Sequence, residues 1–134
     1  MQVQPYLFFD GRCEEAIEFY RGALGARPGQ LTRYKESPEP TQIPPGSADK
    51  VMHASVRIGE TEVMMSDGHC TGAPEFKGFG LTITAKDGAE AQRLFGALYN
   101  GGKVQMPLAK TFFAEHFGMV TDRFGVMWMV IAGM

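Results

Sequence analysis

The 134-residue sequence predicts an α+β fold of two βαβββ modules, in which a cupped, mostly antiparallel sheet carries its helices on the outside. Three observations predict it. Each half contains one amphipathic helical segment, preceded by a short strand-like run. Each helical segment is followed by three further strand-like runs, the last two joined by a short turn. The same order of elements therefore occurs twice, which indicates an internal repeat.

The first module is expected to span about residues 1–70. A strand is predicted over residues 3–9, and the apolar stripe from Asp10 to Gly25 predicts a helix. Asp10 is its expected N-cap, and Gly25 is expected to end it in a left-handed conformation. The three strands that follow are predicted over residues 30–35, 52–58 and 62–66, with a tight turn at 59–61.

The second module is expected to span about residues 76–134. It begins with a strand over residues 81–85. Asp87 and Glu90 form a capping-box pattern at the start of a helix that Asn100-Gly101-Gly102 ends. Strands are predicted over residues 104–113, 117–121 and 126–131, with a turn at 122–125. At this length, we expect the two modules to make a single domain covering residues 1–134.

Composition narrows the class of protein. The net charge of -2, with scattered basic residues, argues against a nucleic-acid partner. No apolar run is long enough for a membrane span, and the N-terminus does not resemble a signal peptide. Cys13 and Cys70 match no metal or redox spacing. We therefore expect a reduced, cytoplasmic protein with no nucleic-acid or membrane partner.

One proline-rich stretch, residues 37–50, interrupts the first module. Its four prolines favour an extended loop. A mobile surface connection is the preferred interpretation, and a lid over a pocket is the alternative.

Three separated blocks of sequence carry a family resemblance. They run from Pro5 to Tyr20 (PYLFFDG and CEEAIEFY), from Met52 to Asp67 (MHAS and MMSD), and from Phe117 (FGMVTDRFG) to Trp128. In this order they resemble the PhnB-like proteins of the vicinal-oxygen-chelate (glyoxalase/bleomycin-resistance/extradiol-dioxygenase) superfamily, over essentially the whole chain. The resemblance implies paired modules around a cup, and a homodimer. Similar sequences are labelled 3-demethylubiquinone methyltransferase-like, but no Gly-rich nucleotide loop follows the first strand, so that activity is not expected.

The resemblance also bears on metal binding. Metal-using relatives place four His, Gln or Glu ligands on the first and last strands of each module. Alignment by helix starts and hairpin turns puts these positions near Pro5, Leu81, Met64 or Met65, and Met129. None of these is an ordinary ligand for such an ion, and a shift by one residue to Gln4, Thr82 and Trp128 is no better. We expect no metal and no cofactor, and whether the chain is an enzyme stays open.

Two polar residues are predicted to contact a ligand. His53, Ser55 and Arg57 share the polar face of a strand whose other face is apolar, so His53 is expected to line the cup; a structural or exposed histidine is the competing interpretation. Ser66 is a small polar residue at a strand end. Its neighbour Asp67 is interpreted as a turn residue.

Apolar residues are predicted to form the rest of the pocket wall. Aromatic rings stack on flat ligands and methionine adapts its shape, so a binding role is assigned to Phe9, Phe113, Met127 and Met129. For the apolar residues of the final strands, core or dimer interface is the preferred interpretation, and the binding role is the functional alternative. Trp128 alternates with the two methionines and is expected to pack against a helix. Strand cations such as Arg57 are interpreted as solvated surface.

Three functions are compatible with these features. The first is binding of an unknown small molecule without metal, in an apolar cup. The second is a metal-dependent lyase, isomerase or dioxygenase of glyoxalase type, with ligands from unexpected positions such as His53, Glu62 and Glu115. The third is a dimeric structural or regulatory partner. We favour them in that order.

Overall fold

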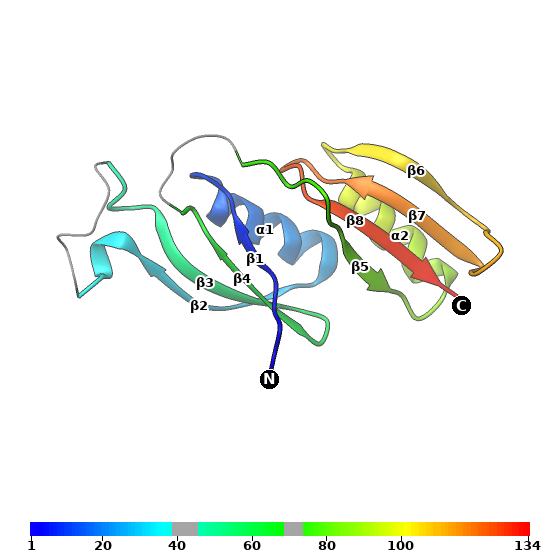
Figure 1. Cartoon of the computed structure of the whole chain (residues 1–134), viewed down its shortest axis with the longest axis horizontal. Helices are drawn as coiled ribbons and strands as arrows, with labels where there is room; N and C mark the ends of the chain where they lie inside the picture. The colour runs from blue at the N-terminus through cyan, green and yellow to red at the C-terminus, as the bar shows by residue number, and fades with distance from the viewer. Residues whose placement is uncertain (39–45, 69–73) are drawn as a thin grey trace. The chain divides into compact units, whose positions relative to one another are not determined.

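The computed structural model describes residues 1–38, 46–68 and 74–134. The chain divides into two compact units, Met1–Pro74 and Glu75–Met134, and each contains a four-stranded mixed sheet and one α-helix (Figure 1). The α+β class and the repeated strand–helix–strand–strand–strand order are confirmed. A single domain around a shared cup stays a prediction. Residues 39–45 of the proline-rich stretch, on which the lid prediction falls, lie outside the described residues.

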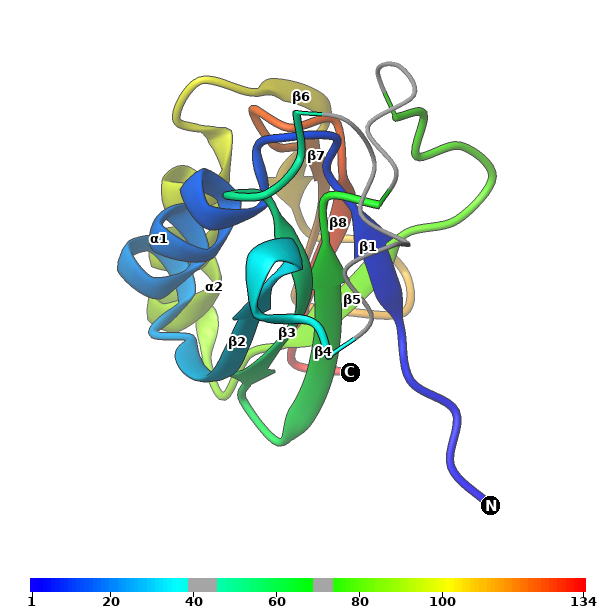
Figure 2. The ribbon, with the colours of Figure 1, turned by 90° about the vertical axis from the view of Figure 1, so that its left-hand side faces the viewer.

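The first sheet has the order β1-β4-β3-β2, with β1 parallel to β4 and the other neighbours antiparallel. Its strands are β1 Tyr6–Phe8, β2 Arg27–Arg33, β3 Val51–Ile58 and β4 Thr61–Ser66. Helix α1, Cys13–Leu24, lies along one face of the sheet, to the left of β2, β3 and β4 in Figure 2. Strand β2 ends two residues earlier than predicted, because the chain turns into a short 3-10 helix, η1, Tyr34–Glu36.

The alternation along the strands decides which face of this sheet is buried. Ala54 and Val56 of β3 are fully buried, whereas His53 and Ser55 are half-buried and Arg57 is exposed. The core under α1 is completed by Leu7 of β1, Val63 and Met65 of β4 and four helix residues: Ala16, Ile17, Tyr20 and Ala23. The predicted polar face of β3 is therefore the face that α1 does not cover.

The C-terminal cap of α1 agrees with the sequence prediction, whereas its N-cap does not. Gly25 ends the helix with a φ of 67°, as predicted, and its N–H donates to the Tyr20 carbonyl. The prediction that Asp10 is the N-cap is wrong. The N-cap is Arg12, which makes no capping bond with its side chain. A carboxylate from elsewhere in the chain serves the first amides: Asp67 Oδ1 accepts from Gly11 N and Cys13 N.

The second sheet repeats the pattern in the order β5-β8-β7-β6, with β5 parallel to β8. Its strands are β5 Leu81–Thr84, β6 Lys103–Ala109, β7 His116–Thr121 and β8 Met127–Ala132. Helix α2 runs over Gly88–Tyr99. Strand β6 is shorter than the predicted 104–113. A turn follows it, in which Thr111 N donates to the Ala114 carbonyl and Ala114 N donates to Thr111 Oγ1.

Helix α2 begins as the sequence predicts. Asp87 Oδ1 accepts from Glu90 N at 2.9 Å, and Glu90 Oε1 accepts from Lys86 N, one residue earlier than in the standard capping box. Trp128 is buried on the sheet face that also carries Gly118 and Val120, where α2 approaches, and its Nε1 donates to Asp122 Oδ2. In the described part of the chain, no helix combines the length and apolar character of a membrane span.

Candidate functional site

The face of the first sheet opposite α1, here called the open face, brings together side chains from all four strands. Residues paired across neighbouring strands point to the same face. The pairings place these residues on it: Tyr6, Phe8, Arg27, Thr32, His53, Ser55, Arg57, Glu62, Met64 and Ser66. The open face is thus aromatic near β1 and charged toward the β3–β4 turn.

Three rings cluster at the β1 side of the open face. The Tyr6 hydroxyl lies 3.2 Å from His53 Nδ1, and the two ring centroids are 5.7 Å apart. Phe8 stacks on Tyr6 with a centroid distance of 4.7 Å and is about half exposed. Tyr6 donates this hydrogen bond when Nδ1 is unprotonated and accepts it when Nδ1 carries a proton. The cluster can present flat apolar surface together with one imidazole ring that hydrogen-bonds.

The other predicted residues of this unit lie deeper. Ser66 is only 1% exposed, beside Phe8, and its Oγ accepts from Gly68 N at 3.1 Å. Phe9 is only 2% exposed and lies in the core, where its ring centroid is 6.4 Å from that of Tyr20. Phe9 therefore lies on the α1 side and contributes no surface to the open face.

Sequence reasoning missed Tyr6 and Phe8. The signal was present, because Leu7 and Phe9 alternate with them and are buried. Period-two alternation would have turned Tyr6 and Phe8 outward once the buried face of this short strand was assigned.

Asp67 has a structural position. It is buried, and its carboxylate accepts three backbone amides: Oδ1 from Gly11 and Cys13, and Oδ2 from Val51, at 2.7–2.9 Å. It joins the start of α1 to the start of β3, in addition to lying at a chain turn. This arrangement also fixes the adjacent Ser66 at the edge of the ring cluster.

The second sheet presents an apolar counterpart, here called the methionine face: Met106, Met119, Met127, Met129 and Phe117, with Thr82 and Thr121. The predicted residues Met127 and Met129 lie on it and are half-buried. Phe113 follows β6 and is 42% exposed; its ring packs edge-on against Phe117 at 5.1 Å. This surface suits an apolar contact better than a charged one.

The expected metal positions carry no ligand set. Tyr6 pairs with Met64 at one of them, and Thr82 with Met129 at the other. In residues 1–38, 46–68 and 74–134, no three His, Cys, Asp or Glu side chains gather closely enough to hold an ion. His53 and Glu62 share the open face, but Glu62 pairs with Arg57, four residues along β3, a separation of about 13 Å. These two side chains are too far apart to ligate one ion.

Comparison with known proteins identifies relatives over the whole chain. The family model described as 3-demethylubiquinone-9 3-methyltransferase matches residues 1–131. Protein YjdN of Escherichia coli strain K12 is 37% identical, covering 97% of this chain and 94% of its own. The crystal structure of PA1353 from Pseudomonas aeruginosa is 43% identical with a TM-score of 0.88, covering 99% of this chain and 98% of its own.

Two further structures place the fold. A PhnB protein from Bacillus cereus, described as a putative 3-demethylubiquinone-9 3-methyltransferase, has a TM-score of 0.83 at 25% identity and covers 99% of this chain and all of its own. The fosfomycin resistance protein FosX from Mesorhizobium loti has a TM-score of 0.64 at 14% identity, covering 100% and 92%, and shows likeness of fold alone. With its repeated modules and these relatives, the chain belongs to the 3-demethylubiquinone-9 3-methyltransferase family, a PhnB-like branch of the vicinal-oxygen-chelate superfamily.

Proposed function

We propose that this protein binds a small, flat molecule without a resident metal ion. The observation that carries the proposal is the cluster of Tyr6, His53 and Phe8 on the open face. Aromatic pairs contribute about 0.5–1.5 kcal/mol beyond the area they bury, so three neighbouring rings are a strong contact for a flat ligand. Phe8 is about half exposed, so it offers apolar surface that a ligand can cover.

In this proposal, the methionine face of the second unit is a separate surface that an apolar ligand can contact. Met127 and Met129 offer flexible, polarisable side chains, and Phe113 and Phe117 offer ring edges. These groups accommodate an apolar body and supply no charge. The ligand is therefore expected to have an aromatic or conjugated part.

Methyl transfer, which the family description names, has less support in the residues. A nucleotide-type cofactor is commonly held by the free amides at a helix N-terminus after a Gly-rich turn. Here the β1–α1 connection contains a single glycine, Gly11. The amides of Gly11 and Cys13 bind the Asp67 carboxylate. This helix N-terminus is therefore already occupied by the protein itself.

A binding experiment tests the proposal directly. A thermal-shift screen of flat aromatic and acidic compounds would find a ligand, because a compound at 100 times its Kd stabilises the folded state by about 2.7 kcal/mol. Calorimetry would then compare the wild type with His53→Ala and Tyr6→Phe. Both variants are expected to bind more weakly, with Tyr99→Phe on the exposed side of α2 as the matched control. Unchanged affinity in both would remove the ring cluster from the site.

Metal stoichiometry separates this function from a metal-dependent enzyme. Protein prepared without a His-tag would be dialysed against Zn, Ni, Mn and Fe in turn, and the bound metal measured per chain. Less than about one ion in ten chains for every metal supports the proposal. One tightly held ion per chain would overturn it and favour glyoxalase-type chemistry.

The same proposal includes a homodimer, which the family resemblance implies, and a cytoplasmic location, which the composition favours. Light scattering coupled to size-exclusion chromatography would give the mass in solution. A mass near 14.7 kDa, that of one chain, would contradict the dimer.

A further inference from the structure

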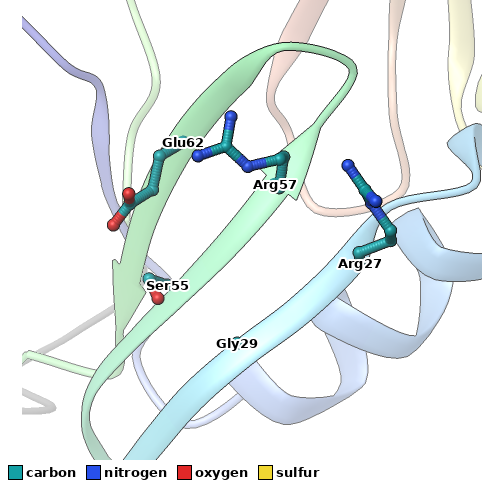
Figure 3. Close-up of a pocket in the computed structure, with 5 residues that line it drawn as sticks. All are labelled: Arg27, Gly29, Ser55, Arg57 and Glu62. Atoms are coloured by element: carbon teal, nitrogen blue, oxygen red, sulfur yellow. The ribbon is translucent and has the colours of Figure 1, made fainter.

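A polar hollow lies at the charged end of the open face, away from the ring cluster. Its volume is about 300 Å³, and its lining residues are Arg27, Gly29, Ser55, Arg57 and Glu62. Figure 3 shows that they come from three neighbouring strands, β2, β3 and β4, with the long side chains rising from the same side of the sheet. Nothing in the family assignment or in the proposed function accounts for it.

A bulge in β2 opens this hollow. Pro28 pairs with Val56 and Leu31 with Ala54, so two residues of β2, Gly29 and Gln30, lie opposite the single residue Ser55. A Cβ placed on Gly29 would lie 2.9 Å from Ser55 Oγ. Because glycine has no Cβ, the Ser55 hydroxyl is left uncovered at the floor of the hollow.

The charges around the hollow are arranged unfavourably for the protein alone. Arg27 pairs directly with Arg57 across β2 and β3, and like charges in directly opposite positions destabilise a sheet. Glu62 pairs with Arg57 on the other side, yet within the described residues no ion pair joins Glu62 to either arginine. Arg57 Nη1 donates instead to the Glu60 carbonyl at 3.1 Å. An anion between the two guanidinium groups would relieve their repulsion.

We infer that this hollow binds the carboxylate or phosphate group of the ligand, with Arg27 and Arg57 as the charged contacts and Ser55 as a hydroxyl donor. Each guanidinium carries five N–H donors in a planar fork that matches both kinds of oxyanion, and only one donor of Arg57 is used in the turn. Glu62 repels a second negative charge, which favours ligands with a single acidic group at this end.

The inference rests on the proposed function, because the hollow and the ring cluster share one sheet face. His53, Ser55 and Arg57 alternate along β3, so the hollow begins about 7 Å from His53 and extends to about 13 Å. These distances suit a ligand with a flat body on the rings and an acidic group in the hollow. The inferred class is therefore an aromatic or conjugated molecule with one carboxylate or one phosphate group.

Three small probes test it on the ¹⁵N-labelled full chain by NMR: benzoate, phenyl phosphate and the neutral benzamide, at constant ionic strength set with sodium chloride. The two acids are expected to shift the Arg27 and Arg57 Nε–H signals and the Ser55 amide saturably. Benzamide is expected to shift only the surroundings of Tyr6 and His53. A tighter Kd for phenyl phosphate than for benzoate would assign a phosphate-type group, and the reverse order a carboxylate.

Matched variants give the quantitative result. Arg27→Gln and Arg57→Gln should each raise the Kd of the acids about tenfold, because a charge-assisted hydrogen bond is lost, and should leave benzamide unchanged. Arg93→Gln is the control: it also removes one positive charge, but from α2 in the second unit, and it should not change the Kd of the acids. Gly29→Val should weaken binding of the two acids although both arginines are intact, because its side chain fills the space above Ser55.

The outcomes separate this inference from the proposed function. Shifts that do not saturate, that chloride reproduces, or that survive in both arginine variants would overturn the anion site. If benzamide still binds and His53→Ala weakens it, the proposed function then stands alone. If the arginine variants weaken binding of the acids while His53→Ala changes the binding of no probe, the anion site stands and the ring cluster is excluded.

Discussion

At the scale of single residues, buried aspartates organise both units. Asp67 accepts amides from two separate segments, the start of α1 and the start of β3. Asp122 acts locally at the β7–β8 turn, where it accepts from Phe124 N, Val126 N and Trp128 Nε1. A carboxylate has acceptors only, so it suits positions surrounded by N–H donors.

The Asp67→Asn variant tests this role. An amide offers one oxygen and an NH₂ group, so at least one of the three backbone donors would face another donor while buried. We expect the free energy of unfolding to fall by about 2–3 kcal/mol in urea denaturation. Asp49→Asn, which changes an exposed carboxylate bound to Lys35, is the control and should destabilise the protein much less. If Asp67→Asn were as stable as the wild type, Asp67 would be only a turn residue.

Cys13 illustrates how burial controls reactivity. It is fully buried at the start of α1, and burial raises the pKa of its thiol far above the usual range, with the Asp67 and Glu14 charges adding to the effect. We expect iodoacetamide to label Cys13 only when the protein unfolds, as followed by peptide mass spectrometry in rising urea. Rapid labelling in native buffer would contradict the buried position.

At the scale of elements, close approach of a helix and a strand depends on glycine. A Cβ on Gly118 of β7 would lie 2.7 Å from the Phe95 ring of α2 and 2.9 Å from Leu108 Cα of β6. There is no room for it because backbone lies on one side and a packed ring on the other. This position therefore sets how closely α2 lies on the second sheet.

Two alanine substitutions in the second unit are expected to act in opposite directions. Gly118→Ala should destabilise the protein by about 1–3 kcal/mol, because the strand must shift to admit a methyl group. Gly96→Ala, in α2 with nothing within 4 Å of the new Cβ, should stabilise it by about 0.5–1 kcal/mol through helix propensity. Thermal unfolding of both variants measures this. A stable Gly118→Ala protein would contradict the packing between α2 and β7.

At the scale of the whole molecule, acid stability depends partly on one exposed network. Arg33 binds Glu14 of α1 at 2.8 Å and lies near Asp49. The hydrogen bond from Arg33 lowers the pKa of Glu14, and Lys35, with Arg33 more weakly, lowers that of Asp49. A carboxyl whose pKa is lower in the folded state adds stability above its unfolded pKa, and that stability is lost as the pH falls.

We expect Arg33→Gln to flatten the loss of stability on acidification. The variant should be slightly less stable than wild type at neutral pH and should approach it as the pH falls through the range where Glu14 takes up its proton. Because these groups are exposed, the difference should shrink at high salt. Chemical denaturation across a pH series measures it, and profiles that stay parallel to the lowest pH would contradict the role of Arg33.

Most of the order of helices and strands can be predicted from local sequence patterns. These patterns involve residues that are close in sequence, so they can be recognised before the fold is known. Examples are the helical spacing of apolar residues, the N-cap at Asp87 and the helix-ending glycine at Gly25. Alternation along β3 likewise predicted that His53 and Arg57 share the face that α1 leaves open. The three sequence blocks that resemble PhnB-like proteins extended the fold prediction over the whole chain.

The contacts between distant residues, in contrast, follow from the folded arrangement of the strands and helices. The carboxylate at the start of α1 comes from Asp67, 54 residues after Cys13, and no local pattern encodes such a partner. The same holds for Tyr6 beside His53 and for Arg27 beside Arg57, which strand pairing brings together. Local spacing specifies the faces of each element, whereas register and bulges between distant strands specify the composition of the site.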